Sequence, residues 1–206
     1  MHTVIDFRPA APADVDVAVP LIVSSGPQAV EYGFALGGRA ASGFLSAAYL
    51  EGRGLFGWAH HTVAVVEGEV AAIAATYGCA AHLRMSLEHA QQVWRHYRWP
   101  AFAVVMRRGL HLRSLMPAPP ASAHYLAHFG VQPARRGQGI GLAMLEHQRE
   151  RARQLGRRTL VLDVSVENTR AAALYRRFGL QDGVLNRFTG PADAVPDTRR
   201  MQMRVL

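Results

Sequence analysis

The sequence predicts a mixed α/β (α+β) fold, because short apolar runs with strand periodicity alternate with longer stretches of helical periodicity. Half of the 206 residues are hydrophobic and no long tract is low in complexity, which is typical of a globular protein. The chain is long enough for one domain with a sizeable core, and no internal repeat divides it. We therefore expect residues 1–206 to form a single domain.

The N-terminal half is expected to open with a short strand that ends at Phe7, followed by helical segments interrupted near Ser24–Pro27. A hairpin comes next: HTVAVV and VAAIAATY flank the turn EGE, where Gly68 supplies the permissive conformation. The periodicity is helical again over 82–113, with a break at Trp99–Pro100 because a residue before proline disfavours the helical conformation. The aromatic residues of this segment could line a pocket, belong to the core or face a partner.

The C-terminal half alternates strand and helix. The expected elements are a strand at 124–131, a helix at 141–155, a strand at 159–166, a helix at 169–178 that Asn168 caps and Gly179 ends, and a final strand in RMQMRVL. In the longer helix, the spacing predicts a buried face made of Leu142, Leu145, Ala152 and Leu155, with Gln148 away from it.

The segment RRGQGIGLAML, at 135–145, has glycine at alternate positions between a strand and a helix. The first turn of a helix leaves amide groups unpaired at the positive end of its dipole, and glycine lets an anion approach them without a Cβ in the way. Ten of the 23 basic residues lie within 135–177, so an anion should bind there. A nucleoside triphosphate loop is excluded, because the sequence has no lysine to follow the last glycine.

Two other readings of this region stay open. A dinucleotide-binding fold would use Asp163, at the end of the next strand, for a ribose, but the third glycine comes one residue early and only about 40 residues follow. A net charge of +8 raises the possibility of an arginine-rich nucleic-acid-binding protein. Arg149, Arg151 and Arg153 would spread around a helix, which favours a solvated surface over a nucleic-acid stripe.

Three motifs in register carry a family resemblance. The segment Arg136–Gly141 resembles the pyrophosphate signature Q/R-x-x-G-x-G/A of the GNAT superfamily of acetyl-CoA-dependent N-acetyltransferases. Upstream, YLAHFGVQPARRG resembles the central strand of the family, and downstream NTRAAALYRRFGL resembles N-x-x-A-x-x-L-Y-x-x-x-G-F, with Leu180 in place of the usual aromatic residue. The motifs lie within a core at about 124–180, and the start FRPAAPADV is similar to the first strand and turn of the family.

The resemblance implies a mixed, mostly antiparallel central sheet flanked by helices, with acetyl-CoA in a splay between central strands. It implies transfer of the acetyl group directly to a primary amine of a small molecule or peptide. The cofactor contacts that it implies are the loop residues Arg136, Gly137, Gln138, Gly139, Ile140 and Gly141, the strand residues Phe129, Gly130 and Val131, and Asn168.

The resemblance also implies a catalytic role for Tyr175, which would protonate the departing thiolate; core packing is the alternative, because its helix carries an apolar stripe. The general base is open. His128 lies on the expected central strand and has a suitable ordinary pKa, although a purely structural strand histidine is the alternative. The other candidates for the base are His124, Glu31, Glu67, Glu69 and Glu167.

We expect no metal, because the ten histidines show no recognisable ligand spacing. We also expect no nucleic-acid partner and no membrane partner, since the longest apolar region is interrupted by glutamates. The start MHTVIDFRPA has no export signal, and a lone Cys79 cannot form an internal disulfide, so a cytoplasmic location is expected. The resemblance also allows a homodimer.

Overall fold

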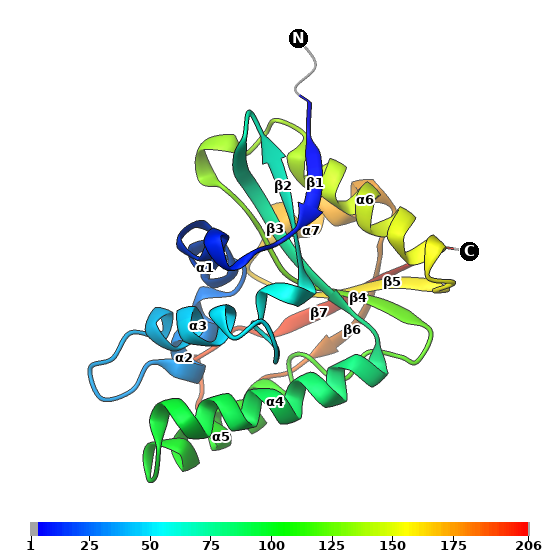
Figure 1. The fold of residues 1–206 in the computed structure, drawn as a ribbon. Helices are drawn as coiled ribbons and strands as arrows, with labels where there is room; N and C mark the ends of the chain where they lie inside the picture. The colour runs from blue at the N-terminus through cyan, green and yellow to red at the C-terminus, as the bar shows by residue number, and fades with distance from the viewer. Residues whose placement is uncertain (1–3, 206) are drawn as a thin grey trace.

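The computed structural model describes residues 4–205. The helices and strands in chain order are β1 (Asp6–Pro9), α1 (Val15–Ser24), α2 (Pro27–Phe34), α3 (Ala41–Leu50), β2 (His61–Val66), β3 (Glu69–Tyr77), α4 (Cys79–Tyr97), α5 (Ala101–Leu112), β4 (Ala123–Val131), α6 (Ile140–Gln154), β5 (Thr159–Ser165), α7 (Thr169–Phe178), β6 (Gln181–Asn186) and β7 (Thr198–Arg204) (Figure 1).

One sheet of seven strands organises the molecule, in the order β1-β2-β3-β4-β5-β7-β6. Every neighbouring pair is antiparallel except β4 and β5, which run parallel. The expected mixed and mostly antiparallel sheet flanked by helices is confirmed. The expected hairpin is also present: Glu67 and Gly68 both adopt positive φ, at 53° and 81°, in the two-residue turn that joins β2 to β3.

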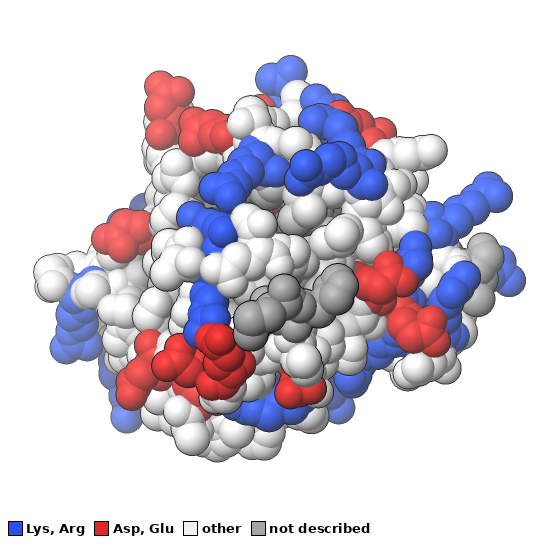
Figure 2. All heavy atoms as spheres, turned by 90° about the horizontal axis from the view of Figure 1, so that it is seen from above, with Lys and Arg blue, Asp and Glu red and all other residues white. Residues whose placement is uncertain are grey.

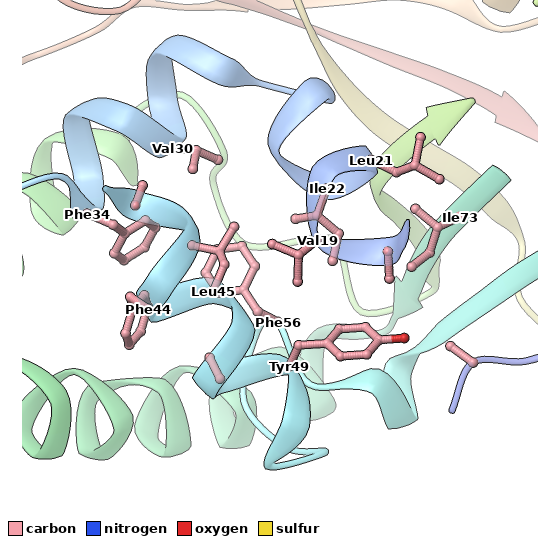
Figure 3. Close-up of a cluster of buried hydrophobic side chains, with 14 of the residues drawn as sticks. Val19, Leu21, Ile22, Val30, Phe34, Phe44, Leu45, Tyr49, Phe56 and Ile73 are labelled. Atoms are coloured by element: carbon pink, nitrogen blue, oxygen red, sulfur yellow. The ribbon is translucent and has the colours of Figure 1, made fainter. Parts of the chain in front are cut away.

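Successive side chains of the central strands point to opposite faces of the sheet and pack in two separate cores. Val63 and Ile73 pack with α1, α2 and α3 in one apolar cluster (Figure 3), while Ala64 and Ala72 pack with α6 and α7 in another. The helices therefore cover both faces, with α6 and α7 on the face opposite α1–α3 (Figure 1).

The segment at 82–113 forms a helical pair, α4 and α5, which packs along α2 and α3 (Figure 1). The expected break is present at Trp99–Pro100. Tyr97 is buried and its hydroxyl donates to the carbonyl oxygen of Phe34, whereas Trp94 is 44% exposed and packs edge-on against Phe102. Tyr97 is therefore a core residue, and Trp94 lies on the outer surface of α4.

The expected buried face of α6 was wrong in part. Leu142 and Leu155 are about half exposed, and Gln148 is fully buried, because the helix meets the sheet along a neighbouring stripe of side chains. That stripe consists of Ile140, Met144, Leu145, Gln148 and Ala152. Gln148 is tolerated there because its Oε1 lies 3.3 Å from Nε2 of His124 on β4.

Candidate active site

The centre of the sheet opens between β4 and β5. The two strands pair only from Ala123 to Leu126 on β4, opposite Thr159 to Leu162 on β5, although both strands continue further. Beyond Leu126, β4 has a pairing partner on one side only, β3. The strands therefore splay apart, and the β5-facing edge of β4 is free to bind an extended ligand.

A bulge in β4 lies where the pairing with β5 ends. Ile73 pairs with Gly130 and Ala75 with Ala127, so His128 and Phe129 both oppose a single residue of β3. His128 adopts a φ of 52°, a conformation that side chains other than glycine rarely adopt. The bulge turns His128 and Phe129 to opposite faces, since His128 stacks on a ring of the α1–α3 core and Phe129 packs in the α6–α7 core.

Gly130 and Val131 continue β4 along the splay. A Cβ at Gly130 would lie 2.5 Å from the carbonyl oxygen of Leu21, so glycine is required there by the close approach of α1. The side chain of Val131 belongs to the α6–α7 core, and its carbonyl oxygen accepts a hydrogen bond from Nε of Arg136 at 3.2 Å. The strand and the glycine-rich loop are thereby joined.

The glycine-rich loop carries the sequence signature into the first turn of α6. Gly137 and Gly139 have φ values of 84° and 82°, and a Cβ at either position would meet nothing within 4 Å. These two glycines adopt the positive φ that the loop requires, and they leave open space in front of the helix N-terminus. Gly141 differs, because a Cβ there would lie 3.1 Å from Cδ2 of Leu174 on α7.

Neighbouring side chains hold the loop in place. Gln138 contacts the carbonyl oxygen of Ala134 at 3.4 Å, and Ile140 is buried in the core beneath α6. Arg135 reaches the β2–β3 turn, with nitrogen–oxygen distances of 2.8 Å to Glu67 and 3.3 Å to Glu69. Glu67 and Glu69, two of the candidates for the base, are therefore both engaged in ion pairs with Arg135.

A groove of about 420 Å³ begins at the loop and runs between α6 and α7. The groove is lined by Gly139, Leu142, Ala143, Glu146, Arg149, Arg177 and Phe178, and Glu146 forms an ion pair with Arg149. The Arg149 guanidinium lies 5.3 Å from the centre of the Phe178 ring. Arg177, the aromatic face of Phe178 and the open helix N-terminus can together hold an extended anionic ligand at this groove.

Tyr175 lies on the same side of the sheet as this groove. It is buried on α7, and its ring centre is 6.3 Å from that of Phe129. Burial raises the pKa of the Tyr175 hydroxyl well above its usual value, so the group is protonated at neutral pH. Tyr175 is 7% exposed, and no hydrogen bond of its hydroxyl is found within residues 4–205.

Asn168 caps α7 as expected: its Oδ1 accepts from the amide of Ala171 at 3.1 Å. The residue is exposed, and the cap leaves its side-chain amide nitrogen unused. Glu167, beside it, contacts the side-chain amide of Gln28 at 3.2 Å.

His128 belongs to a chain of three groups. Its Nδ1 lies 3.2 Å from Nε2 of His61, and Nδ1 of His61 lies 2.9 Å from the carbonyl oxygen of Gly57. Phe56 stacks on His128 with ring centres 4.8 Å apart. Burial, and then the neighbouring imidazoles of His61 and His89, lower the pKa of His128 well below its usual value.

His61 and His89 are the two residues near the splay that sequence reasoning missed. His61 is the first residue of the strand HTVAVV, and the alternation of this strand could have predicted that its side chain is buried. No local pattern marks His89 on α4 as a neighbour of His128. The Nδ1 atom of His89 is enclosed and has no partner in the described part of the chain. Burial lowers the pKa values of both histidines to about 4.

Asp163, the acid that a dinucleotide-binding fold would use for a ribose, is already hydrogen-bonded to other side chains. The Asp163 side chain is fully buried and accepts hydrogen bonds from Arg200 at 2.8 and 3.0 Å, from Tyr125 at 2.8 Å and from Asn186 at 3.0 Å. Asp163 therefore joins four strands and is not available to a ribose.

Basic and acidic side chains are interspersed on the face shown in Figure 2, which argues against one continuous basic surface there. Across residues 4–205, no cluster of three or more histidine, cysteine, aspartate or glutamate residues could hold a metal ion. No helix of this part of the chain is both long and apolar enough to span a membrane.

Comparisons with known proteins agree with this geometry. The family model described as the acetyltransferase (GNAT) family matches residues 39–180. A search of curated proteins gives no match.

Solved structures show the same fold. An N-acetyltransferase from Staphylococcus aureus Mu50 has a TM-score of 0.70 and is 17% identical, covering 96% of this chain and 100% of its own. The ribosomal-protein-S18-alanine N-acetyltransferase from Escherichia coli has a TM-score of 0.54 and is 19% identical, covering 98% and 94%. An agmatine N-acetyltransferase mutant has a TM-score of 0.56 and is 16% identical, covering 97% and 99%.

Proposed function

Because this chain belongs to the GNAT family of acetyltransferases, we propose that it transfers an acetyl group from acetyl-CoA directly to a primary amine of a small molecule or peptide. The observation that carries the proposal is the combination of a splay between β4 and β5 with an open glycine-rich N-terminus of α6 at its edge. We also propose that residues 1–206 act as one domain, since the similar structures cover nearly the whole chain.

The residues fit acetyl-CoA as co-substrate. The amides from Arg136 to Gly141 would hold the pyrophosphate, because Gly137 and Gly139 leave room for it to approach the helix N-terminus. The backbone of Phe129, Gly130 and Val131 would bind the pantetheine arm along the unpaired edge of β4. The unused amide nitrogen of Asn168 would contact the same arm.

The reaction requires two proton transfers. As the amine nitrogen bonds to the carbonyl carbon and the carbon–sulfur bond breaks, the amine loses a proton and the departing sulfur gains one. His128, which burial keeps neutral by lowering its pKa, would accept the first proton at Nε2 once the nitrogen has bonded to the carbonyl carbon, and Tyr175 would donate the second from its hydroxyl. Backbone amides of the splayed strand would stabilise the charge that develops on the carbonyl oxygen.

Two features limit the chemical class of the acceptor amine. A net charge of +8 disfavours polycationic amines, which a basic protein repels. The rings around His128, including Phe56, favour an acceptor with an apolar body and a single amine. The similar structures include an N-acetyltransferase of a ribosomal-protein alanine and one of agmatine, so the likeness of fold does not choose between a peptide and a small molecule.

A transfer assay tests the proposal. The purified protein is incubated with acetyl-CoA and a panel of amines that contains aromatic amines, amino-acid esters, short peptides with free N-termini, and polyamines as the disfavoured class. We expect release of free thiol, and an acetylated amine by mass spectrometry, for at least one monoamine. Failure to bind acetyl-CoA at all would contradict the proposal.

A further inference from the structure

We propose that His61 is a positioning residue for acetyl transfer: it fixes His128 in the tautomer whose Nε2 carries a lone pair and is open to the acceptor amine. This inference rests on the proposed function, because it assigns the acceptor side of that same site. It is carried by the hydrogen-bonded chain from Gly57 through His61 to His128.

The first link fixes the tautomer of His61. A carbonyl oxygen only accepts, so Nδ1 of His61 must donate to Gly57 across the 2.9 Å contact. The carbonyl is held firmly, since a Cβ on Gly57 would lie 2.2 Å from the backbone nitrogen of Arg53. His61 is only 2% exposed, and burial keeps it neutral at neutral pH. Its Nε2 therefore carries a lone pair.

The second link transmits this choice to His128. The lone pair on Nε2 of His61 needs a donor, and Nδ1 of His128 lies 3.2 Å away. His128 must therefore carry its proton on Nδ1. A neutral imidazole has one proton, so Nε2 of His128 is left as an acceptor.

The acceptor amine must also be able to reach Nε2 of His128. His128 is partly exposed, and no hydrogen bond of its Nε2 is found within residues 4–205. The flat faces of Phe56 and His61 lie nearly parallel to the His128 ring, at angles of 15° and 14°, and hold its plane. The bulge places this ring where β5 pairing ends, which is where an amine would meet the thioester.

The site also explains a strained backbone. A histidine at a φ of 52° costs free energy, and such conformations persist where the surrounding structure enforces them. Glycine would adopt this conformation without the strain. A requirement for an imidazole at this position accounts for the strained conformation.

Nuclear magnetic resonance of the wild-type protein tests the inference directly. Nitrogen-15 labelling of the histidines distinguishes a protonated from an unprotonated ring nitrogen, and His128→Gln identifies the His128 signals by their loss. We expect His128 to carry its proton on Nδ1 at neutral pH. A proton on Nε2 in the folded protein would overturn the inference.

Matched variants test the positioning role. In His61→Gln the side-chain oxygen can still accept from His128, whereas His61→Phe keeps a ring without an acceptor. We expect His61→Phe to lose the Nδ1–H tautomer and to lower kcat at least about tenfold, with an unchanged KM for acetyl-CoA, and His61→Gln to retain the tautomer and most of kcat. Equal kcat values in the two folded variants would overturn it.

These outcomes separate the inference from the proposed function. If the wild type binds acetyl-CoA and acetylates an amine but His128 carries its proton on Nε2, the inference alone fails. If the wild type does not bind acetyl-CoA, the proposed function fails and the inference fails with it. Thermal unfolding of both His61 variants shows that any loss of kcat comes from folded protein.

Discussion

At the scale of single residues, the two proposed proton-transfer groups lie on opposite faces of the sheet. His128 stacks on Phe56 in the core beneath α1–α3, and Tyr175 packs with Phe129 beneath α7. An amine and a departing thiolate attach to different sides of the same carbonyl carbon. The bulge at 128–129 places His128 on the face opposite Tyr175, so in the proposed mechanism each of the two groups would have its own proton-transfer residue.

The role of Tyr175 is testable by removing one oxygen atom. Tyr175→Phe keeps the ring packed against Phe129 but removes the proton donor, so we expect kcat to fall by about tenfold to a hundredfold, with little change in acetyl-CoA affinity. Steady-state kinetics and calorimetry measure the two effects. Tyr77→Phe, which removes a hydroxyl from β3, is the control and should keep its activity. Unchanged turnover of Tyr175→Phe would contradict the assignment.

Residues close in sequence could be predicted, and residues brought together by the fold could not. The glycine positions of the loop follow from a local motif, and the cap at Asn168 from a local rule. The proximity of His61, His89 and His128 arises from two strands and a helix far apart in the chain. No local pattern encodes that meeting.

At the scale of elements, the sheet is closed at one end of the splay by a buried polar network. Asp163 on β5 binds Arg200 on β7, Tyr125 on β4 and Asn186 on β6. Arg200 also donates to the carbonyl oxygen of Pro117. The network holds the paired ends of β4 and β5 together, and the strands diverge beyond it.

Breaking this network should destabilise the fold. Asp163→Asn leaves the largely buried Arg200 without its charged partner, so we expect a loss of about 3–5 kcal/mol in the free energy of unfolding. Urea denaturation followed by circular dichroism measures it. Asp182→Asn, which removes a partner of Arg176 at the surface, is the control and should change stability little. A loss below about 1 kcal/mol for Asp163→Asn would contradict the account.

Element prediction failed where tertiary packing decides. The strand β6 was not expected, because QDGVLN is polar and contains glycine; it forms as an edge strand that needs only one partner, β7. The buried stripe of α6 was shifted because His124 offers a partner to Gln148, which no helical periodicity reveals.

At the scale of the whole molecule, folding depends on several neutral, buried histidines. The pKa values of His61 and His89 fall to about 4, below the ordinary 6.5. The unfolded chain therefore binds protons in the range from pH 6.5 to 4 that the folded protein does not bind. Stability is fully present above this range and is lost as the pH falls through it.

We expect acidification from pH 7 to pH 5 to lower the free energy of unfolding by about 2 kcal/mol for each such histidine, as an upper limit. Urea denaturation at the two pH values measures the loss. His89→Phe removes one titrating group from an aromatic cluster and should reduce the loss accordingly. Equal losses in the wild type and the variant would show that His89 is not held neutral.

Acetyl-CoA binding at the open N-terminus of α6 is the central proposal for the whole molecule, and calorimetric titration tests it most directly. The wild type is titrated with acetyl-CoA beside Gly139→Glu, which places a carboxylate in the space in front of the helix, and Gly156→Glu at the other end of α6. Both glycines have positive φ and open surroundings, so backbone strain is matched. We predict micromolar binding by the wild type and by Gly156→Glu, and none by Gly139→Glu. Equal binding by all three proteins, or none by the folded wild type, would contradict the claim.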